Sequence, residues 1–281
     1  MGATAASRRR REPRRGTSDL AARVLVAIPA VAFAALIIER GGASFALGTL
    51  ALGLVCLHEL FKMYERVRPV RLAAILALAG MVAAAALGGE RQVLLATVAF
   101  LPALFLLALA MPEREGGPSL TASMSITALG ALWIAGGIAH AVLLRDLPHG
   151  GGLVLAVVMG TFIGDTAAYL GGRLLGTRRL APRISPNKTV EGLLIGMVVA
   201  TFTVWWYGLS TEWMGGERGV LLGLGVAVAA PLGDLFESKV KRDAGSKDAG
   251  SLFGAHGGAL DRLDAVLFSL PTAYYLWLAL A

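Results

Sequence analysis

The chain has 281 residues, of which 56% are hydrophobic and only 16% are charged. Soluble domains carry about 25% charged residues, so this composition excludes an ordinary soluble protein and indicates an all-α polytopic integral membrane protein. The formal net charge of +7 would suit a nucleic-acid-binding protein, but membrane topology explains it better, and we expect no nucleic-acid partner. The single cysteine, Cys56, excludes an internal disulfide and a cysteine-based metal site.

The N-terminal segment, residues 1–19, is basic and polar, which indicates a cytoplasmic tail without a packed core. An apolar run follows at 24–38, and its sequence AFA at 32–34 resembles a signal-peptidase site. A cleaved signal peptide is therefore one interpretation of this run. We prefer a retained first transmembrane helix over residues 20–38, with Arg23 reaching the interface.

Eight further apolar segments follow, each close to the roughly 20 residues that a helix needs to cross the hydrocarbon core. Together with the first helix they predict about nine spans in a single transmembrane catalytic domain over residues 20–281. The eight segments are residues 43–61, 69–88, 92–111, 119–144, 151–175, 190–209, 219–236 and 262–281.

The distribution of positive charge predicts the orientation of these spans. With the N-terminus inside, all but four of the 26 Lys and Arg residues fall in inner segments. Lys and Arg concentrate on the cytoplasmic side of membrane proteins, so we expect a cytoplasmic N-terminus and an external C-terminus. The four exceptions are Arg40, Arg91, Arg145 and Arg218.

Two stretches combine apolar sequence with ionisable residues, and the first covers residues 161–192. Asp165, Tyr169 and Arg173 follow one another at steps of four, so they share one face of the sixth predicted helix. A carboxylate inside an apolar run is costly without a function or a partner. Because Arg173 is two turns from Asp165, the partner must come from another span.

The same stretch continues as ISPNKTVEG before the seventh predicted helix. Ser185 and Pro186 suit the start of a helix, and Asn187 or Thr189 could cap it. A helix N-terminus with Lys188 beside it makes a good phosphate site. We therefore expect this segment to bind an anion.

The second stretch, residues 234–264, reads DLFESKVKRDAGSKDAGSLFGAHGGALDRLD. Asp234, Ser238 and Arg242 recur at four-residue steps and share one helical face. A solvated loop whose charges only set topology is the alternative interpretation. Against it, Asp234 follows an apolar run closely enough to lie at membrane depth, where an acid needs a partner.

Two further acids follow in this stretch. Asp261 and Asp264 are three residues apart, so both carboxylates point from one turn of a second helix. Carboxylates beside many cations suggest a divalent metal that holds a polyphosphate, with the acids on the ion and the bases on the phosphate oxygens. The bases are Lys239, Lys241, Arg242, Lys247, His256 and Arg262.

The spacing of these residues is specific. S-K-V-K-R, K-D-A-G and F-G-A-H-G-G-A-L-D-R-L-D, between Ser238 and Asp264, resemble the signature of the phosphatidate cytidylyltransferases, which are the CDP-diacylglycerol synthases. The sequence departs from that signature at Gly254, where proline is common, and at Ala259, where a larger aliphatic residue is usual. D-x-x-A-Y-x-x-G-R-x-x-G and S-P-x-K-T-x-E-G, within residues 165–192, resemble two further blocks of this family.

A weaker element ends the second predicted span. Its sequence HELFKM, with His58 and Glu59, resembles another element of the family. A glutamate at the membrane interface near Lys62 explains Glu59 equally well.

The resemblance implies the reaction CTP + phosphatidate → CDP-diacylglycerol + pyrophosphate, at the cytoplasmic side of a bacterial inner (plasma) membrane. It implies Mg²⁺, with a second cation as an option, and a homodimer is a possible assembly. We expect Asp234, Asp261 and Asp264 to hold the metal and, with Lys247, to be the catalytic residues. The expected substrate-binding residues are Asp165, Tyr169, Arg173, Ser185, Lys188, Ser238, Lys241, Arg242, His256, Gly257, Gly258 and Arg262.

Two other functions would use similar residues. An ion- or proton-coupled transporter would also need acids such as Asp165 and Asp234 in the membrane. A transporter would, however, place charges near the midplane with access from both sides, whereas here almost all ionisable groups fall on one face. A CTP-dependent lipid kinase would also use CTP and a metal at a membrane, but it would transfer the γ-phosphate.

Overall fold

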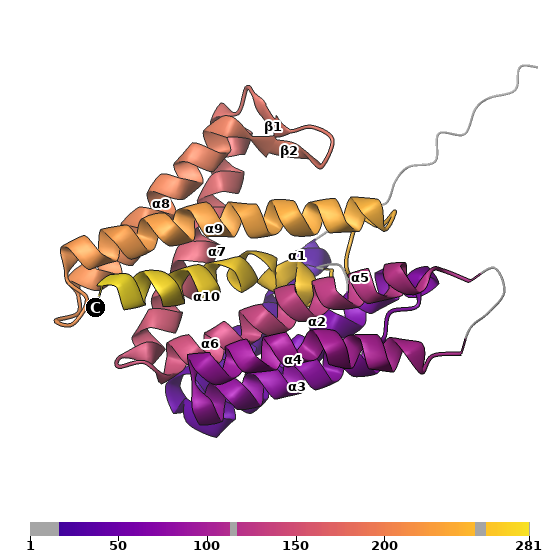
Figure 1. The fold of residues 1–281 in the computed structure, drawn as a ribbon. Coiled ribbons are helices and arrows are strands. Elements are labelled where there is room, and N and C mark those ends of the chain that lie inside the picture. The colour runs from indigo at the N-terminus through magenta and orange to yellow at the C-terminus, as the bar shows by residue number, and fades with distance from the viewer. Residues whose placement is uncertain (1–16, 113–116, 251–256, 281) are drawn as a thin grey trace, which may run out of the picture.

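The computed structural model describes residues 17–112, 117–250 and 257–280, with side chains from residue 28 onward. Nearly all of the described residues are helical, and the helices form one bundle (Figure 1). In this bundle α9 and α10 lie side by side, α10 packs against α6 of the N-terminal half, and α7 crosses behind both of them to reach the hairpin. The predicted all-α class is confirmed.

The N-terminal half supplies one side of the bundle. The helix from 120 to 146 is continuous but contains a π-helical turn at its centre, labelled η2. The elements are α1 (Thr17–Arg40), α2 (Gly42–Met63), the short turn η1 (Glu65–Val67), α3 (Arg71–Gly88), α4 (Glu90–Leu109), α5 (Leu120–Gly130), η2 (Ala131–Ala135) and α6 (Gly136–Asp146).

The C-terminal half carries both ionisable stretches. A two-stranded antiparallel hairpin connects its first two helices and projects beyond the helical bundle (Figure 1). The elements are α7 (Gly150–Leu175), β1 (Arg179–Ala181), β2 (Ser185–Thr189), α8 (Val190–Leu209), α9 (Gly216–Asp243) and α10 (Leu260–Leu280).

Eight helices in the described part of the chain are long and apolar enough to cross a membrane. Helix α1 lies where the first span is predicted and adds a ninth helix to them. The outward faces are apolar as well: on α4, Leu94, Val98 and Leu101 are exposed. Such a surface is costly in water and suits a helix that faces lipid. The chain is therefore a polytopic membrane protein.

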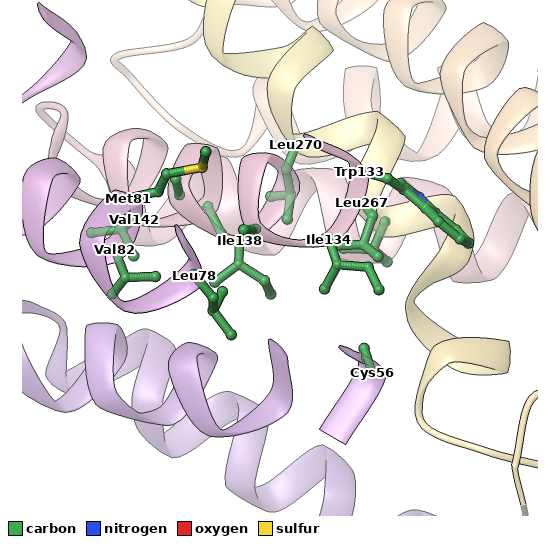
Figure 2. Close-up of a cluster of buried hydrophobic side chains, with 14 of the residues drawn as sticks. Cys56, Leu78, Met81, Val82, Trp133, Ile134, Ile138, Val142, Leu267 and Leu270 are labelled. Carbon is green, nitrogen blue, oxygen red and sulfur yellow. The ribbon is translucent and has the colours of Figure 1, made fainter. Parts of the chain in front are cut away.

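A buried apolar cluster joins the two halves. Figure 2 shows Cys56 of α2, Leu78 of α3 and Ile138 of α6 gathered with Leu267 of α10, and all four are buried. Burial of these side chains against one another fixes α10 to the N-terminal half. The position of α10 matters because it carries Asp261 and Asp264.

Close backbone approach holds α7, α8 and α9 together on the other side. A Cβ atom at Gly164 of α7 would lie 2.8 Å from the Cβ of Ala200 on α8, and one at Gly196 of α8 would lie 2.6 Å from the Cβ of Ala168. Small residues at such contacts let membrane helices pack tightly. The packing places the two ionisable stretches next to each other.

The structure corrects one prediction and extends another. Ser185 and Pro186 belong to β2 and do not start a helix. Of the two predicted caps, Asn187 and Thr189, Thr189 is the N-cap of α8, and its hydroxyl accepts from the Gly192 amide at 3.1 Å. Helix α9 continues beyond the predicted end at 236 to Asp243. The hairpin was not predicted, because its short strands have no alternating apolar pattern.

Candidate active site

A cavity of about 820 Å³ lies between α7, both strands of the hairpin, α8, α9 and α10. Its size is within the usual range for a site that holds a nucleotide-sized ligand. Both ionisable stretches contribute to its wall, although they are far apart in the sequence. The charged residues that line it are Asp165, Arg173, Arg179, Lys188, Asp234, Glu237, Lys241, Asp261, Arg262 and Asp264.

One ion pair joins the two stretches directly. Lys188 of β2 pairs with Asp234 of α9, and the Ser238 hydroxyl donates to the same carboxylate at 3.3 Å. Asp165 of α7 lies within electrostatic range of both Lys188 and Asp234. The cation near Asp165 therefore comes from the hairpin and not, as predicted, from another span.

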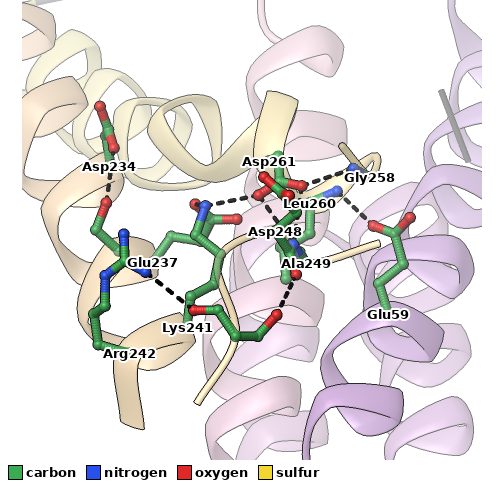
Figure 3. Close-up of polar contacts among 12 residues, drawn as sticks. Glu59, Asp234, Glu237, Lys241, Arg242, Asp248, Ala249, Gly258, Leu260 and Asp261 are labelled. Atoms are coloured by element: carbon green, nitrogen blue, oxygen red, sulfur yellow. Dashed lines mark hydrogen bonds and ion pairs between the residues drawn. The ribbon is translucent and has the colours of Figure 1, made fainter. Parts of the chain in front are cut away.

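A second lysine links α9 to α10. The Nζ of Lys241 lies 2.5 Å from Oε2 of Glu237 and 2.7 Å from Oδ1 of Asp261 (Figure 3). Glu237 is only 1% exposed, and its Oε1 has no hydrogen-bond partner within the described residues. A buried carboxylate oxygen without a partner is costly unless it meets a cation or a donor.

Glu237 is not among the site residues that the sequence predicts. The residue lies one turn after Asp234 and one turn before Lys241, so it points toward the same side of α9. That periodicity was the available signal, but on an isolated helix Glu237 and Lys241 also form an ordinary surface pair. Only the burial of Glu237 distinguishes this pair from an ordinary surface pair.

The two acids of α10 have different surroundings. Asp261 accepts from the Gly258 amide at 2.7 Å and from the Ala249 amide at 3.0 Å, in addition to its contact with Lys241 (Figure 3). Asp264 is 7% exposed and lies within electrostatic range of Asp234. Its burial in the cavity wall beside other acids is the arrangement expected where a cation binds.

Comparison with known proteins agrees with this arrangement. Residues 21–280 match a family model described as the cytidylyltransferase family. The chain belongs to the cytidylyltransferase family. The match covers every helix that contributes to the cavity.

Three relatives show how far the similarity extends. A phosphatidate cytidylyltransferase of Synechocystis is 45% identical over 119 residues, which cover 40% of this chain and 38% of that protein. One of Mycobacterium leprae is 38% identical over 172 residues, or 59% and 53% of the two chains. The uncharacterized Escherichia coli protein YnbB is 35% identical over 143 residues, or 49% and 48%. The similarity thus spans about half or less of these curated relatives.

The structure brings many of the residues implied by the family resemblance to one place. Tyr169, Arg173 and Arg262 line the cavity with the acids. Gly257 has a φ of +79°, a conformation that favours glycine, and Gly258 holds Asp261 through its amide. These positions are consistent with their predicted roles, which stay predictions.

Other predicted residues lie differently. Among the described residues, six predicted site residues are not part of the cavity wall: Ser185, Ser238, Arg242, Lys247, Gly257 and Gly258. Arg242 instead donates to the Ile184 carbonyl at 3.3 Å and so fastens the hairpin to α9. His256 lies outside the described residues, as does most of the predicted tail at 1–19.

The predicted metal site can be compared with the donors present. Within the described ranges, no group of three or more His, Cys, Asp or Glu side chains is placed to hold a metal ion. The chemistry of the donors nevertheless fits Mg²⁺, because the cavity wall offers carboxylate oxygens. One of them, Glu237 Oε1, has no hydrogen-bond partner in the described chain. The metal ligands Asp234, Asp261 and Asp264 stay a prediction.

Proposed function

We propose that this protein is a phosphatidate cytidylyltransferase that makes CDP-diacylglycerol and pyrophosphate from CTP and phosphatidate. The observation that carries the proposal is the cavity in which Lys188 of the first ionisable stretch pairs with Asp234 of the second. A site that must hold two phosphate-bearing substrates needs this mixture of cations and acids. The names of the relatives from Synechocystis and Mycobacterium leprae point to the same reaction.

The reaction joins two anions, so electrostatics is the main task of the protein. A phosphatidate oxygen attacks the α-phosphorus of CTP, the new P–O bond forms, and the bond to the β-phosphate oxygen breaks to release pyrophosphate. A phosphate monoester has a second pKa of about 6, so the attacking group is already an anion near neutral pH. The protein therefore needs no dedicated general base for this step.

The cations of the cavity wall have the roles that this chemistry requires. Lys188, Lys241, Arg173 and Arg262 line the cavity and would neutralise phosphate oxygens as the two substrates approach. Fixed charges in a site shielded from water stabilise the developing charge without reorganising. Lys188 and Lys241 would exchange their present carboxylate partners for phosphate oxygens when CTP binds.

Mg²⁺ is the cofactor that we propose, with a second cation as an option. When bound, it would neutralise phosphate oxygens and favour departure of pyrophosphate. Asp234, Asp264 and Glu237 are the cavity residues that would hold it, with Asp261 placed next to them through Lys241.

The wall of the cavity also suits a lipid substrate. Besides charged groups, it contains small apolar residues of three helices, including Gly164 of α7, Ala200 of α8 and Ala227 of α9. A lateral path between membrane helices would admit phosphatidate from lipid, and CTP would enter from the cytoplasm. We propose that the charged end faces the cytoplasm across a bacterial inner membrane, as the excess of Lys and Arg indicates.

The deciding experiment uses detergent-purified protein with phosphatidate, Mg²⁺ and CTP labelled at either the α- or the γ-phosphate. We expect label from the α-phosphate to enter the lipid phase and label from the γ-phosphate to leave as pyrophosphate. Transfer of the γ-label to lipid would instead show a lipid kinase. Absence of both products from a folded, CTP-binding protein would contradict the proposal.

The orientation can be tested by cysteine labelling in intact cells. Arg183 in the hairpin and Glu212 between α8 and α9 are both exposed and lie at opposite ends of α8. We expect Glu212→Cys to react with an impermeant thiol reagent from outside, and Arg183→Cys to react only after the membrane is opened. The native Cys56 is fully buried and serves as the unreactive background. Labelling of Arg183→Cys in intact cells would reverse the topology.

A further inference from the structure

Glu59 is a buried acid outside the cavity wall. It lies near the end of α2 and is 4% exposed, so its carboxylate faces other protein groups and not lipid headgroups or water. No residue of α2 lines the cavity in the described chain. A buried carboxylate is costly unless it is well hydrogen-bonded, and the contacts of Glu59 therefore need an explanation.

The carboxylate of Glu59 holds the start of α10. Its Oε2 accepts from the Leu260 amide at 2.9 Å, although the two residues are 201 positions apart (Figure 3). Leu260 is the first residue of α10, whose leading amides have no partner within the helix. The adjacent backbone is equally close, because a Cβ atom at Gly250 or Gly258 would overlap the Glu59 carboxylate.

Asp261 holds the same backbone from a neighbouring position. It accepts from the amides of Ala249 and Gly258. Ala249 precedes Gly250, and Gly250 and Gly258 are the two glycines that touch Glu59. Its other contact is Lys241 in the cavity wall. Glu59 and Asp261 therefore contact the same two backbone segments, Ala249–Gly250 and Gly258–Leu260, and Asp261 in turn contacts Lys241.

The end of α2 also holds α9. The Tyr64 hydroxyl donates to the Val240 carbonyl at 2.8 Å, one residue before Lys241. Burial raises the pKa of Tyr64, which keeps this hydroxyl protonated as a donor. Cys56, one turn before Glu59, lies within electrostatic range of Glu237 and Asp264. The last turns of α2 thus support both helices that carry the Lys241–Asp261 pair.

We infer that Glu59 is a positioning residue, which holds the Gly250 and Gly258–Leu260 backbone so that Asp261 and Lys241 are correctly placed for the phosphates of CTP. The inference rests on the proposed cytidylyltransferase function. Glu59 touches neither substrate; it acts through Leu260 and the backbone that Asp261 also binds. Gly250 and Gly258 are required beside it because any side chain there would displace its carboxylate.

The kinetic test compares three substitutions of Glu59 with a matched control. Glu59→Gln keeps the length and an acceptor oxygen, Glu59→Asp keeps the charge but is too short to reach Leu260, and Glu59→Ala removes both. We expect the Asp and Ala variants to raise the KM for CTP by roughly tenfold, a change in ground-state binding, while the KM for phosphatidate changes little. Glu59→Gln should stay within about twofold to threefold of wild type.

The control is Glu65→Gln. This acid lies just beyond α2, its side chain is 76% exposed, and within the described chain it forms an ion pair with Arg71 at 3.8 Å. It should leave both KM values unchanged. A merely structural loss at Glu59 would lower the amount of active enzyme without changing either KM, so the separate KM values distinguish positioning from folding.

A second measurement does not depend on activity. Hydrogen exchange at the amides of Ala249, Gly258 and Leu260 should become faster in Glu59→Asp and Glu59→Ala, but not in Glu65→Gln. Gly250→Ala alone should raise the KM for CTP as Glu59→Ala does. Added to Glu59→Ala, it should change the KM little, because the methyl group of the new alanine then occupies the space of the missing carboxylate. Wild-type exchange and an unchanged KM for CTP in a folded Glu59→Ala protein would overturn the inference. A wild-type protein that makes no CDP-diacylglycerol would instead refute the proposed function, while the exchange data would still test the contact.

Discussion

Asp234→Asn and Asp264→Asn should each lower turnover by roughly two to three orders of magnitude, the effect that loss of one preorganised electrostatic contact has in other enzymes. Both carboxylates line the cavity. Asparagine has nearly the same shape as aspartate but lacks the charge that Mg²⁺ and Lys188 require. The substitutions therefore remove electrostatics while leaving the packing of α9 and α10 in place.

The measurement is turnover at saturating CTP over a range of Mg²⁺ concentrations, with thermal stability recorded for each variant. We expect a strong shift of the Mg²⁺ dependence for Asp234→Asn and Asp264→Asn. Asp261→Asn should also lose activity, because one of its oxygens would no longer pair with Lys241 or accept from the Ala249 amide. Near-wild-type activity of Asp234→Asn or Asp264→Asn would remove that residue from the proposed metal site, and near-wild-type activity of Asp261→Asn would show that its contact with Lys241 is dispensable.

Lys188→Ala should raise the KM for CTP by roughly ten- to a hundredfold, which corresponds to the loss of one charge-assisted contact of about 1.5–3 kcal/mol. Lys188 extends from β2 into the cavity and pairs with Asp234. If its contact with CTP is equally strong in the ground and transition states, kcat should change little. The Mg²⁺ dependence at saturating CTP should also stay close to that of the wild type.

A lysine on the same side of the bundle provides the control. Lys239 is half exposed, pairs with Asp243 one turn away on α9, and does not belong to the cavity wall of the described chain. Lys239→Ala should leave the KM for CTP unchanged. If Lys188 only orders the start of α8, Lys188→Ala will lose stability or expression while its CTP dependence stays normal. That result would exclude the phosphate contact.

Local physical requirements explain how much of the fold the sequence predicts. The predicted spans at 43–61, 151–175 and 190–209 correspond closely to α2, α7 and α8, because the thickness of the bilayer sets the length of each apolar run. The four-residue steps from Asp165 to Arg173 and from Asp234 to Arg242 predict shared helical faces. The family resemblance rests on the same local order of residues, and the family match over 21–280 agrees with it.

The departures lie where local pattern is weak. The hairpin from β1 to β2 is short and polar, so apolar alternation does not mark it, and its turn lacks the Asn-Gly or Asp-Gly pair typical of tight hairpins. Its formation moves Lys188 out of the helix start and into the wall of the cavity. Helix α9 runs past its apolar segment to Asp243, and its last turns contact Tyr64 at the end of α2 and the Ile184 carbonyl of the hairpin through hydrogen bonds.

By itself, the sequence determined the class of protein, the positions of its spans and the residues that carry its charge, because each of these depends on neighbours within a few turns. Only the tertiary structure decided which charges meet: Lys188 with Asp234, Lys241 between Glu237 and Asp261, and Glu59 with Leu260. A helical period places a side chain on a face, but it does not say which other helix packs there. That partner depends on small-residue contacts and buried side chains distributed over the whole bundle. The same packing buries two glutamates, Glu237 in the cavity wall and Glu59 against the start of α10.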